Sequence, residues 1–233
     1  MQLTLGMTLR DDATFDNYFA GNNRQVIHHL REMMAGCGEH FIYLYGEAGV
    51  GVSHLLQACC HEAKSPAIYL PLSEPHLTPE VLQNLESIDF VCLDDIEHVL
   101  GDCHWEEALL HFYNRVREQS NRLVIGAKAL PAFTPCFLPD LKSRLSWGLV
   151  LPMVELQENE KITTLQLRAE QRGLLMSLLV AQFLLRQHRG NMTTLFHFLD
   201  RLDKASLQAK RRLTIPFVKE VLAEDEVIIS VHE

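Results

Sequence analysis

The hydrophobic positions of residues 1–152 follow two alternating patterns. Short continuous apolar runs are typical of buried strands, whereas apolar residues that recur every three or four positions are typical of one face of a helix. The runs predict strands at residues 41–45, 67–72, 90–93, 122–126 and 149–151, and the spaced positions predict helices at residues 23–34, 78–85 and 105–119, with another starting near Leu55. Strands that alternate with helices indicate an α/β fold with a parallel sheet flanked by helices.

The pattern changes at Pro152, and beyond it the apolar spacing is helical throughout. Four helices are expected, of which one ends at Gly173 and the next three begin near Ser177, Thr193 and Thr214. Prolines before this boundary predict a loop from Pro131 to about residue 140. We therefore predict an α/β domain over residues 13–152, a small helical domain over 153–222, a preceding segment 1–12 and a tail 223–233.

A glycine-rich turn follows the first strand and has the spacing of a P-loop, with Gly46, Gly51 and Ser53 at the motif positions. In such a loop, backbone N–H groups and the start of a helix hold phosphate. Ser53 keeps the hydroxyl that can ligate Mg²⁺, but Val52 replaces the phosphate-binding lysine. Glycines also serve ordinary tight turns, so the motif alone leaves that alternative open. The predicted nucleotide contacts are Glu47, Ala48, Gly49, Val50, Gly51, Val52, Ser53 and His54.

Two carboxylates, Asp94 and Asp95, end the third apolar run. Ligands of open α/β sheets bind at the carboxyl ends of the strands. We expect Asp94 to hold Mg²⁺ and Asp95 to polarise a water molecule. The alternative is a solvated pair of acids, which the P-loop at this distance makes less attractive.

Two aromatic residues, Phe15 and Tyr18, precede the first predicted helix. Either ring could pack on a nucleotide base, although aromatic residues more often belong to the core. At the start of the chain, Gln2, Leu3, Leu5 and Met7 form a compact set that an extended peptide could place in an apolar groove of a partner. A frayed end or an edge strand is the alternative for that segment.

The composition of the chain excludes several classes of protein. The net charge of −9 argues against a general nucleic-acid binder, which needs a basic face. The six cysteines lack paired CxxC spacing and the twelve histidines form no HExxH motif, so no metal other than Mg²⁺ is expected. We find neither a signal peptide nor an apolar run of membrane-spanning length, so the expected location is the cytoplasm without membrane contact.

Several motifs resemble those of the DnaA/Hda family of bacterial AAA+ proteins, and the resemblance covers nearly the whole chain. The residues that carry it are Thr14–Tyr18, Asp94–Glu97, Leu141–Gly148 and Leu213–Glu220. The family implies an AAA+ nucleotide-binding domain followed by a helical lid. It also adds Asn17, next to Tyr18, to the expected nucleotide contacts.

The chain stops after the lid, and Gln2–Met7 resembles the family's clamp-binding hexapeptide. Both features are those of the shorter, Hda-type members, which join the DNA-loaded sliding clamp and promote hydrolysis of the ATP held by DnaA. The resemblance therefore implies negative regulation of replication initiation. The implied partners are DnaA and the sliding clamp, with DNA reached only through the clamp, and a homo-oligomer is expected.

The chain departs from the family at positions that face phosphate. Val52 replaces the P-loop lysine, Gly126 occupies the place of a polar sensor, and Thr193 stands where the lid has an arginine. Because phosphoryl transfer depends on positioned charge, we expect little intrinsic turnover, with Asp95 weak or vestigial. The expected cofactor is a nucleotide, ADP, that acts as a structural ligand, with Mg²⁺, if bound, at Ser53 and Asp94.

Arg144 is retained, and the resemblance makes it an arginine finger that acts in trans on the nucleotide of a neighbouring subunit. The alternative is a surface ion pair with Asp140, four residues earlier on a helix. Two other functions stay open at this point. A self-sufficient ATPase or small-molecule kinase would turn over alone, and a replisome adaptor or helicase loader would leave DnaA unaffected.

Overall fold

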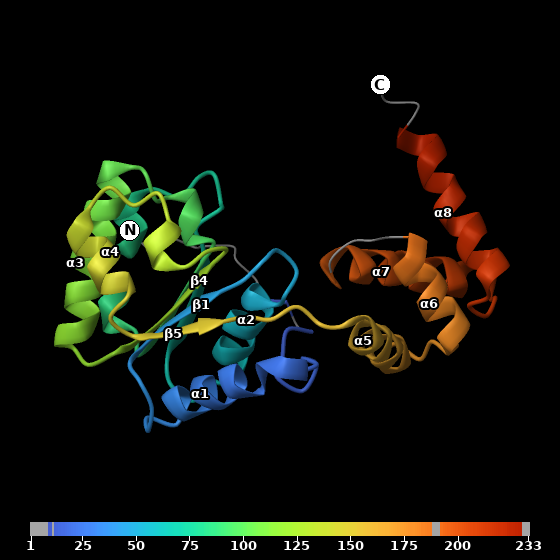
Figure 1. The fold of residues 1–233 in the computed structure, drawn as a ribbon, viewed down its shortest axis with the longest axis horizontal. Coiled ribbons are helices and arrows are strands. Elements are labelled where there is room, and N and C mark those ends of the chain that lie inside the picture. Colours follow the sequence, from blue (N-terminus) through green and yellow to red (C-terminus); the bar gives the residue numbers. More distant parts are fainter. Residues whose placement is uncertain (1–8, 11, 188–191, 230–233) are drawn as a thin grey trace. The chain divides into compact units, whose positions relative to one another are not determined.

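The computed structural model describes residues 9–10, 12–187 and 192–229. The chain divides into two compact units after Glu155, and each is described by itself (Figure 1). Within the described residues, no helix combines the length and the apolar character needed to cross a bilayer.

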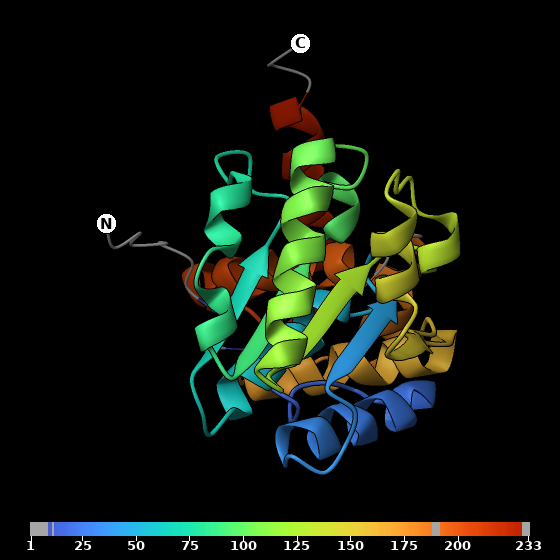
Figure 2. The ribbon, with the colours of Figure 1, turned by 90° about the vertical axis from the view of Figure 1, so that its left-hand side faces the viewer.

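The first unit contains a parallel sheet of five strands in the order β2-β3-β4-β1-β5. Its strands are β1 (Phe41–Tyr45), β2 (Ala67–Pro71), β3 (Phe90–Asp94), β4 (Arg122–Ala127) and β5 (Leu149–Pro152). Every residue of β3 is buried, which explains its continuous apolar run. All four strand pairings are parallel, and the arrows visible in Figure 2 point the same way, so the carboxyl ends of the strands lie at one edge of the sheet. The predicted parallel α/β fold is confirmed.

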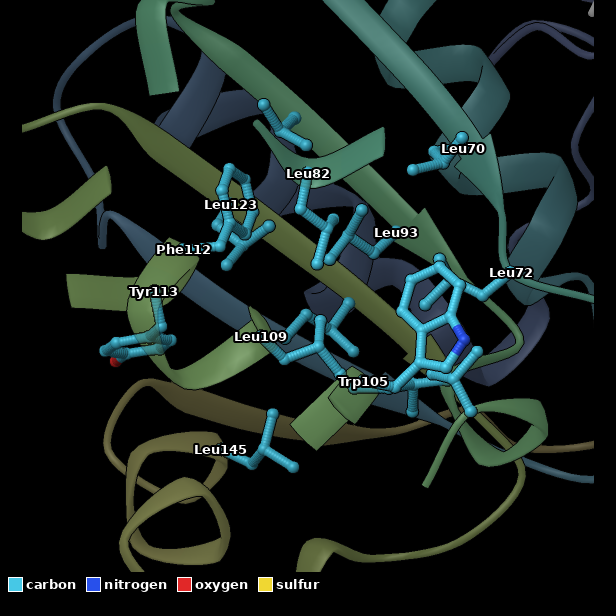
Figure 3. Packing of buried hydrophobic residues seen from close by; sticks show 14 of the residues in the cluster. Leu70, Leu72, Leu82, Leu93, Trp105, Leu109, Phe112, Tyr113, Leu123 and Leu145 are labelled. Atoms are coloured by element: carbon cyan, nitrogen blue, oxygen red, sulfur yellow. The ribbon is translucent and has the colours of Figure 1, made fainter. Parts of the chain in front are cut away.

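Helices cover both faces of this sheet. On one face lie α1 (Arg24–Met34) and α2 (Val52–Glu62), and on the other lie α3 (Cys103–Glu118) and α4 (Pro139–Leu145). Strand alternation divides the side chains between the two faces, so Ile42 and Leu44 pack with α2 while Tyr43 joins α3. Figure 3 shows the α3 side, where Leu109 and Phe112 lie against Leu123.

Two local predictions for the first unit are wrong. The helix predicted at residues 78–85 is instead two separate 3₁₀ turns, Pro79–Leu82 and Leu85–Ser87. Asn84 between them has a left-handed φ of 67°, which stops the helix. The loop predicted from Pro131 ends one residue early because Pro139 begins α4, as its fixed φ allows at the first helical position.

The second unit is entirely helical in its described part. It consists of α5 (Glu158–Gln171), α6 (Leu178–Gln187), α7 (Met192–Ala209) and α8 (Ile215–Ile229). Gly173 closes α5 with a φ of 74°. The hydroxyls of Ser177 and Thr214 accept backbone N–H groups at the starts of α6 and α8, at 3.3 and 3.4 Å. The predicted caps are confirmed.

Candidate functional site

The glycine-rich turn joins β1 to α2 at the carboxyl edge of the sheet, as the motif predicts. Gly49 and Gly51 have φ angles of 88° and 100°, a region that strains any other residue. A Cβ on Gly46 would lie 2.8 Å from atoms of both Val50 and Met153. The turn therefore requires its glycines, and it leads into the N-terminus of an 11-residue helix. Such a terminus can hold phosphate through backbone N–H groups alone.

Val52 is the first residue of α2, at the place of the P-loop lysine. Only 9% of its surface is exposed, and it packs with Leu55 and Leu56 in the core under the sheet. A Cβ on Gly126 would lie 2.8 Å from Val52 Cγ1 and would also meet Asp94 Oδ1. At the two positions where the family has phosphate-facing polar groups, this chain therefore has the apolar side chain of Val52 and, at Gly126, no side chain.

Asp94 ends β3 and is 2% exposed. The hydroxyl of Tyr69 donates to its Oδ2 at 2.7 Å, and the Asp95 N–H donates to its Oδ1 at 3.0 Å. The Ser53 hydroxyl lies close enough to this carboxylate to lower its pKa. Burial raises the pKa of Asp94, and these hydrogen bonds oppose the rise.

The two predicted Mg²⁺ ligands, Ser53 and Asp94, are therefore neighbours. Their hydroxyl and carboxylate oxygens are ligands of the kind that Mg²⁺ prefers, so the residues present fit the ion. Tyr69 belongs to this network although its sequence context, an ordinary strand position, gave no sign of a polar role.

Asp95 adopts a left-handed φ of 55° just after the strand. Its Oδ2 accepts the Ser73 hydroxyl at 2.8 Å. Its carboxylate lies within 4.8 Å of ligand atoms of Glu97 and His98, but Lys128 already pairs with Glu97 Oε1 at 2.8 Å. The Lys128 ammonium group therefore already balances one carboxylate of this cluster. The activation of water by Asp95 stays a prediction.

The segment before α1 covers the turn. Tyr18 donates its hydroxyl to the Val50 carbonyl at 3.1 Å, and its ring centroid lies 5.4 Å from that of His54. Burial raises the pKa of Tyr18 to about 12, so this hydroxyl keeps its proton at neutral pH. The buried amide of Asn23 donates to the Tyr18 oxygen at 3.2 Å and pairs twice with the Val154 backbone. Nothing in the sequence marks Asn23 for this role, because it resembles an ordinary residue at the start of a helix.

Three other predicted nucleotide contacts occupy different surroundings. Phe15 is 6% exposed in the core, with the Arg31 guanidinium carbon 5.0 Å from its ring centroid. Asn17 donates its side-chain N–H to the Asp12 carbonyl at 3.1 Å. Thr193 is exposed in the first turn of α7, in the second unit. These roles stay predictions, and the clamp-binding residues Gln2, Leu3, Leu5 and Met7 lie outside the described residues.

Arg144 lies in the last turn of α4, where it lines a small cavity with Phe41 and Tyr113. Its guanidinium carbon is 4.1 Å from the ring centroid of Trp147, and that of Arg117 is 4.7 Å from the same centroid. Within the part of the chain that the structure describes, Arg144 forms neither a side-chain hydrogen bond nor an ion pair, so the alternative pairing with Asp140 is not formed. Its N–H donors remain available to an anion.

Glu106 holds the segment that leads into α4. This side chain of α3 has no exposed surface, and its carboxylate accepts the N–H groups of Gly101 at 2.8 Å, Phe137 at 3.0 Å and Leu138 at 2.7 Å. Burial acts to raise the pKa of Glu106, but the backbone donors lower it below its usual value. A buried anion therefore fixes the residues immediately before the helix of Arg144.

Comparison with known proteins shows which families this sequence resembles. Residues 158–222 match the family described as the Hda lid domain, and residues 75–152 match the bacterial DnaA ATPase domain. A protein of Haemophilus influenzae, itself uncharacterised, is 42% identical over 226 residues, which cover 95% of this chain and 98% of that protein.

Solved structures agree in fold. Domain III of the replication initiation protein DnaA from Thermotoga maritima has a TM-score of 0.80 at 20% identity, over 94% of this chain and 98% of that one. AMPPCP-bound DnaA from Aquifex aeolicus has a TM-score of 0.67 at 22% identity, over 78% of this chain and 62% of that one. The two family models, together with this fold, the glycine turn and the acidic strand end, show that the chain belongs to the DnaA/Hda family of AAA+ proteins.

Proposed function

We propose that this protein restrains the initiation of DNA replication by stimulating ATP hydrolysis on DnaA. In this proposal Arg144 enters the nucleotide site of a neighbouring DnaA molecule. The protein's own site holds ADP as a structural ligand, and the segment Gln2–Met7 attaches the protein to the DNA-loaded sliding clamp. DNA is then reached only through the clamp, and self-association uses the same AAA+ faces.

The observation that carries the proposal is the guanidinium of Arg144, whose N–H groups have no acceptor among the described residues, in a chain with Val52 and Gly126 at the P-loop lysine and sensor positions. Transfer of a phosphoryl group needs positive charge where the equatorial oxygens become negative. Val52 and Gly126 supply none. A protein built in this way holds a nucleotide through backbone N–H groups and offers its cation to another subunit.

The decisive experiment measures hydrolysis of DnaA-bound ATP on clamp-loaded DNA with Arg144→Ala. A trans-acting arginine contributes about 10³–10⁵ in rate, so the variant should lose nearly all stimulation. Arg144→Lys should restore little, because an ammonium group lacks the planar pair of donors. Both variants should retain nucleotide binding, clamp binding and the melting temperature of the parent.

Arg24→Ala serves as the matched control, since it removes an exposed arginine from α1 in the same unit and should stimulate like the parent. Parental stimulation by Arg144→Ala would refute the finger and would favour the replisome-adaptor alternative. Hydrolysis by the purified protein alone, at a rate comparable with stimulated DnaA, would favour the self-sufficient ATPase.

Attachment to the clamp has a separate test. Gln2→Ala, or Leu5→Ala combined with Met7→Ala, should weaken binding to the isolated clamp at least tenfold, because several side chains share one short ordering cost. Surface plasmon resonance measures the affinity, and Thr8→Ala, just outside the hexapeptide, is the control. Unchanged clamp affinity in both hexapeptide variants would remove the clamp from the proposal.

A further inference from the structure

We infer that Trp147 is the positioning residue of Arg144: its indole holds the guanidinium at the subunit surface while leaving the hydrogen-bond donors free. The inference rests on the proposed function and adds the residue that pre-organises the finger. Trp147 is 54% exposed, an unusual exposure for the largest side chain, and packing into the core does not account for it.

Backbone and side-chain contacts both join Trp147 to Arg144. The backbone N–H of Trp147 donates to the backbone carbonyl of Arg144 at 3.0 Å in the turn that ends α4, and the two side chains meet beside this turn. The 4.1 Å separation between guanidinium carbon and ring centroid is a van der Waals contact, well inside the range of a cation–π interaction.

Neighbouring elements fix the indole. Arg117, in the last turn of α3, approaches the same ring at 4.7 Å. On the backbone side, a Cβ on Gly148 would lie 2.7 Å from the carbonyl carbon of Phe41, so only glycine lets the turn approach β1 so closely. The Trp147 ring therefore contacts guanidinium groups from both α3 and α4, and the backbone of the adjacent Gly148 packs against β1.

This arrangement suits a residue that must act on another molecule. An arginine side chain has many rotamers, and ordering them when subunits meet would reduce the stimulated rate. Contact with a ring face uses none of the N–H donors, which lie in the guanidinium plane. Trp147 thus removes part of the ordering cost in advance without competing for the phosphate oxygens.

The test compares Trp147→Leu with Trp147→Phe in the DnaA hydrolysis assay, over a range of concentrations of this protein. Leucine keeps apolar bulk but has no ring, so the maximal stimulated rate should fall about three- to tenfold. The half-saturating concentration should change less than twofold, and phenylalanine should keep at least half of the parental rate. Phe133→Leu, which removes a ring that is 79% exposed, is the control.

Nuclear magnetic resonance provides a readout that does not need DnaA. The ring current of Trp147 should shift the Arg144 Nε–H proton upfield, and Trp147→Leu should return it to its ordinary position. A parental maximal rate in Trp147→Leu, a faster rate, a change confined to the half-saturating concentration, or an unshifted Arg144 proton in the parent would each overturn the inference. If Arg144→Ala abolishes stimulation while Trp147→Leu does not, the inference fails and the proposed function stands.

Discussion

The phosphate turn (residues 46–53) and the α3–α4 edge, meaning the surface around Glu106, Arg144 and Trp147, belong to the same unit and differ in charge. At the turn, backbone geometry is intact, with left-handed glycines and a helix N-terminus, but Val52 and Gly126 provide no charge. At the edge, Arg144 keeps its charge, and a buried carboxylate and an indole brace the segments around it. The difference illustrates that holding a nucleotide and stabilising phosphoryl transfer make separate demands, because the first needs aligned N–H groups and the second needs cations.

The largest expected effect concerns the edge. Glu106→Ala removes a fully buried side chain and the acceptor of the partly buried N–H groups of Gly101, Phe137 and Leu138, so the free energy of unfolding should fall by about 3 kcal/mol. Urea denaturation measures it. Glu107→Ala, at the exposed neighbouring position of α3, should change stability by less than about 0.5 kcal/mol. Equal losses in the two variants would show that the edge is not braced by this carboxylate.

A smaller effect tests the turn. Val52→Lys restores a cation beside Asp94, and calorimetry should show about tenfold tighter binding of ATP, equivalent to about 1.4 kcal/mol. The gain for ADP should be smaller, because the added charge lies nearest the terminal phosphate. Val50→Lys, which places the same charge within the turn but outside the motif position, is the comparison. Equal gains for ATP and ADP, or no gain, would mean that the turn does not lie over a terminal phosphate.

The smallest expected effect is a pH dependence. Burial raises the pKa of Asp94 above that of the unfolded chain, so folding favours its protonated form. The unfolding free energy of the parent, minus that of Asp94→Asn, should therefore rise as the pH falls from 7 through the raised pKa towards about 4, the usual value for aspartate. In a Val52→Lys background this rise should shrink, because the ammonium group stabilises the ionised carboxylate. A difference that does not vary with pH would contradict the assignment.

The sequence was sufficient where local spacing determines structure. Glycines at fixed intervals predict the phosphate turn, and the carboxylates after an apolar run predict Asp94 at the edge of the sheet, because parallel strands end together there. Helix caps at Ser177 and Thr214 follow from residue type alone.

Residues whose partners are distant along the chain escaped prediction. Tyr69 reaches Asp94 from another strand, and Glu106 binds backbone groups some thirty positions away. Each occupies an ordinary polar or aromatic position in its own element, so periodicity gives it no distinguishing mark. In the sequence, Trp147 stands out only as part of a family motif, because its contacts depend on where α3 and α4 place their arginines.

The crowding at Gly126 has an evolutionary consequence. Any side chain introduced there brings a Cβ that would collide with Asp94 Oδ1 and would lie 2.8 Å from Val52 Cγ1 and 3.1 Å from Leu56 Cδ2. A mutation that restores the sensor by itself therefore strains a buried strand, and one that restores the lysine by itself leaves the sensor missing. Restoring both groups therefore takes two or more coordinated substitutions, because each one alone leaves the site incomplete, and such a barrier behaves as an evolutionary ratchet.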